Sequence, residues 1–105
     1  MRITVSHNKS KEEVMRSVDR SFDDLFRGVS VIPLQLVDER RNWQGSVLTF
    51  SFAAKMGFVS TPIRGSVDVS DKDVTIDVDL GLLERLIPAA TTRDAITSKV
   101  RGLLR

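Results

Sequence analysis

Apolar and polar residues alternate with a period of two along the middle of the chain, from residue 34 to residue 80. This period is typical of β-strands that are buried on one face only. It is clearest where Leu48, Phe50 and Phe52 alternate with Thr49 and Ser51. The strands expected from the pattern span residues 34–37, 47–54, 58–69 and 74–80.

Short polar segments connect these strands. Residues 38–41 carry the first strand into a turn at residues 42–45, and further turns are expected at residues 55–57 and 70–73. The third strand is either continuous or broken near Pro62, because proline cannot donate a ladder hydrogen bond. Connections this short favour an antiparallel meander with one apolar face.

A strand and a helix precede the meander. Ile3 and Val5 alternate with polar residues in a short strand at residues 2–6. Ser10 and Glu13 then have the spacing of a capping box, which predicts a helix over residues 10–27 that ends before Gly28. Its apolar stripe comprises Val14, Val18, Phe22, Leu25 and Phe26.

A second helical region follows the meander. Residues 81–87 predict one or two helical turns, which Pro88 interrupts because it disfavours helical geometry at the residue before it. Thr91 or Thr92 then caps a final helix. Its apolar stripe comprises Ile96, Val100, Leu103 and Leu104.

The order of these elements is β-α-β-β-β-β-α, and it predicts one α+β domain over residues 1–105. We expect a two-layer sandwich in which both helices cover the apolar face of the antiparallel sheet. If each element reverses the direction of the chain, the first strand runs antiparallel to the last and pairs beside it.

Charge and composition exclude several classes of protein. Sixteen Lys and Arg against 14 Asp and Glu leave a net charge of +2, and the cations are scattered. Nucleic-acid interfaces concentrate cations among aromatic residues. Only Arg40 and Arg41 beside Trp43 approach that pattern, and we interpret them as a solvated rim, with no nucleic-acid partner.

Targeting signals and thiol chemistry are also excluded. The chain has no cysteine, so a disulfide scaffold, a thiolate metal site and a catalytic thiol are ruled out. No apolar run approaches the roughly 18 residues of a membrane span. The apolar stretch in residues 1–5 is shorter than a signal peptide requires. We therefore expect a soluble, cytoplasmic protein without a membrane span.

No set of residues has the spacing of a catalytic, cofactor or metal site. His7 is the only histidine, and it lies between a strand and a capped helix, where a polar turn residue is expected. The densest acidic group comprises Asp68, Asp71, Asp73, Asp77 and Asp79. It lacks the central glycine and the closing glutamate of a calcium loop. We interpret its members as solvated carboxylates, with Arg64 as a cross-strand partner. Phosphate-loop and nucleophile-elbow motifs are absent from the sequence. The sequence therefore predicts a protein that is not an enzyme and needs no cofactor or metal.

Trp43 is the candidate surface contact. An exposed tryptophan in a hairpin loop is able to anchor a protein to an apolar surface or a partner. The alternative is that Trp43 folds back and covers the end of the core. Met15, Phe22 and Phe26 are expected in the core, unless part of a helix face stays exposed for dimerisation.

Several segments carry a resemblance to a known family. The strand Ile3–Ser6 leads directly into an amphipathic helix, and Trp43-Gln44-Gly45 precedes the strand Leu48–Phe52. Gly65–Val69 and Val74–Leu80 follow as alternating strands, the second leading into Leu-rich residues and a closing helix. In these segments the chain resembles the polyhydroxyalkanoic acid system family, small proteins encoded beside polyester synthesis or granule genes.

This resemblance implies a non-enzymatic protein that acts at the surface of a polyester granule or on a granule protein. Trp43 or a helix face would make the contact. The alternative is a small START-like or Bet v 1-like domain that holds an apolar ligand between sheet and helices, although a chain of 105 residues leaves little volume for one. A homodimer formed through a sheet edge or a helix face is compatible with both functions.

Overall fold

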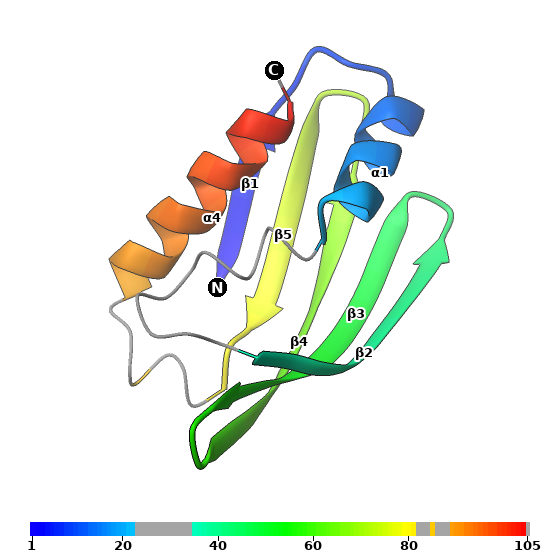
Figure 1. Ribbon diagram of the computed structural model, residues 1–105. Helices are drawn as coiled ribbons and strands as arrows, with labels where there is room; N and C mark the ends of the chain where they lie inside the picture. Colours follow the sequence, from blue (N-terminus) through cyan, green and yellow to red (C-terminus); the bar gives the residue numbers. More distant parts are fainter. Residues whose placement is uncertain (23–34, 82–84, 86–88, 105) are drawn as a thin grey trace.

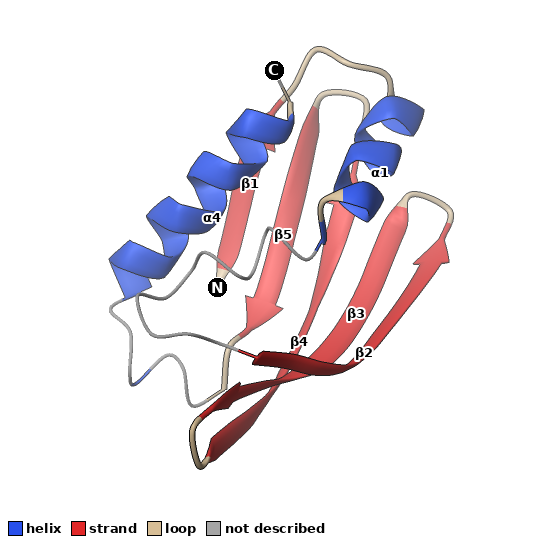
Figure 2. Ribbon diagram, in the orientation of Figure 1, coloured by secondary structure: helices blue, strands red, loops and turns tan. Residues whose placement is uncertain are grey.

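The computed structural model describes residues 1–22, 35–81, 85 and 89–104, and it contains one antiparallel sheet in the order β1-β5-β4-β3-β2 (Figure 1). Both described helices lie on the same side of this sheet (Figure 2). The predicted α+β class and the order β-α-β-β-β-β-α are confirmed. The elements are β1 (Arg2–Ser6), α1 (Lys11–Arg20), β2 (Gln35–Gln44), β3 (Val47–Met56), β4 (Val59–Val69), β5 (Asp73–Asp79) and α4 (Ala89–Leu103).

β1 pairs with β5, as predicted from the reversal of each element. The pairing is antiparallel and sets Ile3 opposite Ile76 on the helix-covered face, where both side chains are buried. On the open face, Thr4 lies opposite Thr75, and their hydroxyl oxygens are 3.2 Å apart. The alternation of the sequence thus separates a dry face from a wet face in every pair of β1 and β5.

α1 begins at its predicted cap. Ser10 Oγ accepts a hydrogen bond of 3.2 Å from the backbone N–H of Glu13. The helix ends at Arg20, and the N–H of Ser21 donates to the carbonyl of Ser17. The expected continuation over residues 23–27 lies outside the described residues, as does most of the expected helix at residues 81–87.

The core lies between the sheet and the two helices. Val14 and Val18 of α1 and Ile96 and Val100 of α4 are each at most 3% exposed. They pack against the apolar side chains of the sheet, because the helical and strand periods both place apolar residues on the facing surfaces. The buried sheet residues include Ile3, Val5, Leu48, Phe50, Phe52, Ile63, Val67, Val69, Val74, Ile76 and Val78.

The prediction of a turn at residues 42–45 is wrong. β2 continues through these residues, and the chain reverses at Gly45 and Ser46, with Gln44 paired to Val47. Gly45 has φ of +61°, which glycine adopts without strain and which fits the first central position of a type II′ hairpin turn. The polar residues before it form an edge strand, which a bulge between Val37 and Arg40 bends.

The prediction that Phe58 begins a strand is also wrong. Met56 pairs with Val59, so Gly57 and Phe58 are the two residues of the β3–β4 turn. Gly57 has φ of +60°, which again suits the first turn position. The apolar residues at alternate positions of β3 continue through Met56 to Phe58, and this is why the pattern did not separate Phe58 from a strand.

Candidate surface-contact sites

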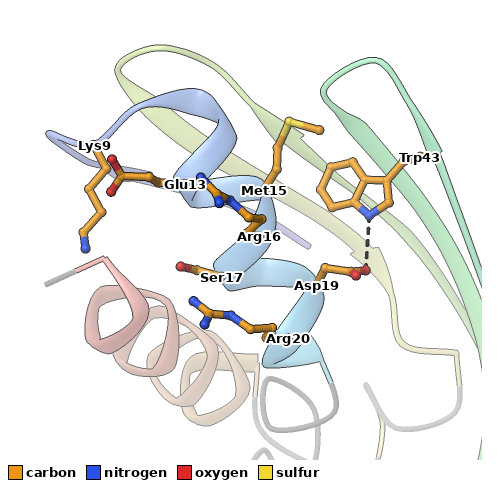
Figure 3. A pocket seen from close by; sticks show the side chains of 8 residues that line it. All are labelled: Lys9, Glu13, Met15, Arg16, Ser17, Asp19, Arg20 and Trp43. Carbon is orange, nitrogen blue, oxygen red and sulfur yellow. Dashed lines mark hydrogen bonds between the residues drawn. The ribbon is translucent and has the colours of Figure 1, made fainter.

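Trp43 lies on the helix-covered face of β2 and reaches α1. It pairs with Leu48 across the β2–β3 hairpin, and its side chain is half-buried against the core. The indole N–H donates a hydrogen bond of 3.2 Å to Oδ1 of Asp19 (Figure 3). Trp43 is therefore a partly exposed side chain that is fixed to a helix, and its role as a contact stays a prediction.

Arg41 fixes the same end of α1 from the neighbouring position on this face. Its Nη1 donates to the carbonyl oxygen of Asp19 at 2.8 Å and lies 3.3 Å from the carboxylate Oδ1. Its Nε lies 2.7 Å from a carboxylate oxygen of Glu39. The guanidinium carbon lies 5.0 Å from the centre of the Phe22 ring, within the range of a cation–π contact. Arg41, one of the two cations that most resembled a nucleic-acid contact, is thus bonded to groups of the protein itself.

An open hollow of about 700 Å³ lies along the outer surface of α1 beside Trp43. The side chains that line it lie around the helix and do not converge on one centre (Figure 3). Ligand pockets enclose most of their ligand, so this open surface is a poor fit to a small apolar molecule. The lining residues are Lys9, Glu13, Met15, Arg16, Ser17, Asp19, Arg20 and Trp43.

The tip of the β3–β4 hairpin carries the most exposed large apolar side chain among the described residues. Phe58 has a relative exposure of 109%, so its ring is as accessible as in an extended peptide, and the adjoining Val59 is 40% exposed. In Figure 1 this hairpin projects beyond both helices. Sequence reasoning did not single out Phe58. The signal that was available is Gly57, because a glycine at the first position of a two-residue turn places the next residue at the tip.

His7 is buried and fully engaged. Its side chain lies 2.8 Å from the carbonyl oxygen of Ser70 through Nε2, and its Nδ1 accepts from the N–H of Lys9 at 3.1 Å. A carbonyl only accepts, so Nε2 carries the proton and donates it to Ser70. The ring connects the β1–α1 segment to the β4–β5 turn, which is a structural use of the histidine.

Three of the five aspartates of the acidic group have separate partners. Asp77 forms an exposed ion pair of 3.2 Å with Arg2, and Asp79 accepts from the N–H of Gly81. Asp73 accepts from the hydroxyl of Ser70 within the β4–β5 turn. Arg64 lies opposite Asp79 in the register of β4 and β5. Within the described ranges, no cluster of three or more histidine and acidic side chains has the arrangement of a metal site.

None of the helices in the described part of the chain has the length and apolar character needed to cross a membrane. No protein-family model, curated protein or solved structure matches the sequence or the fold.

Proposed function

We propose that this chain is a non-enzymatic protein that attaches to an apolar body in the cytoplasm, and specifically to the surface of a polyester granule or to a protein on that surface. The choice of a polyester granule rests on the family resemblance carried by the strands around Trp43 and by residues 65–80. The exposed apolar tip of the β3–β4 hairpin supports the mode of attachment.

The observation that supports attachment is the full exposure of Phe58 at the end of a projecting hairpin. Burying one phenylalanine side chain contributes about 1.5–3 kcal/mol. A protein that leaves such a group in water forgoes this energy in the monomer, and an apolar surface or partner recovers it. Val59 extends the apolar tip on the adjacent strand residue.

The alternative, a small apolar-ligand binder, needs an internal cavity between sheet and helices. Val14 and Ile96 from the helices, and Leu48 and Val67 from the sheet, are each 0% exposed and belong to one core cluster. The hollow beside Trp43 lies on the outer side of α1. These positions favour attachment over internal binding, and displacement of an apolar dye distinguishes the two functions.

The test is co-sedimentation of the purified protein with isolated polyester granules at low and high salt. Apolar attachment predicts binding that resists salt, because charge contacts between exposed groups are screened and apolar burial is not. Phe58→Ser is expected to weaken binding about 10- to 100-fold. Phe58→Leu is the matched control that keeps an apolar tip, and Trp43→Phe tests the candidate from the sequence.

The outcomes separate the possibilities. Binding that survives protease treatment of the granules identifies the granule surface, and binding lost on that treatment identifies a granule protein. Binding abolished by salt contradicts apolar attachment. The absence of binding to untreated granules would overturn the granule proposal, and equal binding by Phe58→Ser and the parent would remove Phe58 from it.

A further inference from the structure

Within the β3–β4 hairpin, positive and negative side chains lie toward opposite ends of β4. No acidic residue occurs between Glu39 and Asp68, so the hairpin formed by β3 and β4 carries only cations up to its last strand residues. Lys55 is exposed and lies one residue before the register pair that closes the turn at Phe58. The apolar tip therefore has a cation beside it, and the one carboxylate of the hairpin, that of Asp68, lies at its other end.

The opposite end of β4 is acidic. Asp68, Asp71 and Asp73 lie there with Lys72. The β1–α1 segment, which His7 joins to this turn, adds Lys9 and Lys11 together with Glu12 and Glu13, so carboxylates outnumber lysines at this end. β4 has 11 residues, which at about 3.3 Å per residue separates the two ends by roughly 35 Å. Figure 1 accordingly places the β4–β5 turn and the β3–β4 tip at opposite ends of the sheet.

The acidic residues of the neighbouring edge strand do not cancel this division. Asp38 and Glu39 lie beyond the pair formed by Val37 and Ala53, away from the tip, and Glu39 is bonded to Arg41. At the tip itself, β2 contributes Gln35, which pairs with Lys55.

We infer that the tip formed by Lys55, Phe58 and Val59 enters an anionic phospholipid layer. A surface of this kind offers an apolar interior for the aromatic ring and negative head groups for the ammonium group. It also repels the carboxylates at the far end of β4, so the charge division orients the protein with its tip toward the lipid. The inference rests on the proposed function in taking attachment to an apolar body as given, and it adds the chemistry of that body's outer layer.

The experiment is co-sedimentation with sucrose-loaded vesicles of phosphatidylcholine alone and of phosphatidylcholine mixed with phosphatidylglycerol. Binding is expected to be about fivefold tighter with phosphatidylglycerol, and rising salt should remove this difference without abolishing the binding that Phe58 provides. Lys55→Gln is expected to weaken binding to the mixed vesicles about fivefold, and Phe58→Ser at least tenfold. Lys72→Gln removes an exposed lysine at the acidic end and is the matched control that should not reduce binding.

Equal binding to both vesicle types, or equal losses for Lys55→Gln and Lys72→Gln, would overturn the inference. Binding to granules without binding to either vesicle would also overturn it and would leave the proposed function standing. Binding to phosphatidylglycerol vesicles without binding to granules would support the inference and contradict the granule proposal. Circular dichroism of each variant checks that a loss of binding is not a loss of folding.

Discussion

The ring of Phe50 lies against the backbone of Gly65 on the neighbouring strand. The two residues are register partners in β3 and β4, and a Cβ atom on Gly65 would lie 2.7 Å from Cζ of Phe50. It would also lie 2.5 Å from the carbonyl oxygen of Asp77 on the other side. The ring of Phe50 in turn meets that of Phe22 edge-on, with centroids 5.0 Å apart. The missing side chain at position 65 thus allows an aromatic group to fill the space under α1.

Gly65→Ala is therefore expected to destabilise the protein by about 1–3 kcal/mol, because the added methyl group overpacks a closed site. Gly102→Ala is the matched control. It lies in α4 with no atom within 4 Å of an added Cβ, so alanine should be neutral there or stabilise by up to about 1 kcal/mol. Urea unfolding followed by circular dichroism measures both. A neutral Gly65→Ala would mean that Phe50 is able to move away from the backbone.

The buried histidine gives a second prediction. His7 donates from Nε2 to Ser70 and accepts at Nδ1 from Lys9, so the neutral ring is expected in the Nε2–H tautomer. Nitrogen chemical shifts of this single histidine identify the tautomer directly. His7→Phe keeps a ring but leaves two backbone groups unpaired, which should cost about 1–3 kcal/mol. Replacing the exposed neighbour Asn8 by alanine should change the stability by less than about 0.5 kcal/mol.

The sequence predicted the layers of this fold because its two hydrophobic periods are distinct. Strand pairing followed from connection length, as the partnership of β1 with β5 illustrates. The errors arose where local chemistry competes with the period. In β2, a run of charged residues indicated a turn, but an edge strand exposes enough of its surface to accommodate them, and Asp38 adopts φ of +56° in the bulge.

The candidate contacts were predicted only in part, for a related reason. A sequence pattern assigns a side chain to a face but does not show what stands opposite it. The sequence singled out Trp43 as a candidate, yet its hydrogen bond to Asp19 joins residues 24 positions apart and depends on how α1 docks on the sheet. Phe58 was not singled out, because its exposure depends on whether the strand pairing ends one residue before it or continues through it.

The junction of α1 and β2 provides a third prediction. Asp19→Ala removes the acceptor of the Trp43 indole and the partner of Arg41. The Asp19 side chain is 54% exposed, so the lost ion pair should cost no more than about 1 kcal/mol. Because Trp43 is the only tryptophan, its fluorescence emission reports the local change, and we expect a shift to longer wavelength.

Glu12→Gln, an exposed change on the same helix, is the control for that emission shift. A double-mutant cycle that combines Asp19→Ala with Arg41→Met measures the coupling between the two side chains. Unchanged emission in Asp19→Ala would show that packing alone, without the indole hydrogen bond, fixes Trp43.

The fourth prediction compares two phenylalanines of the same hairpin. Phe50 is 4% exposed and Phe58 is 109% exposed. Phe50→Ala should cost about 3–5 kcal/mol of unfolding free energy, because it opens a cavity in the core. Phe58→Ala should change it by less than about 0.5 kcal/mol, because the ring already lies in water. Urea unfolding decides between these values, and a large loss for Phe58→Ala would show that the ring packs within the protein. If the stability is unchanged while granule or vesicle binding falls, the apolar tip is kept for contact with a surface and not for folding.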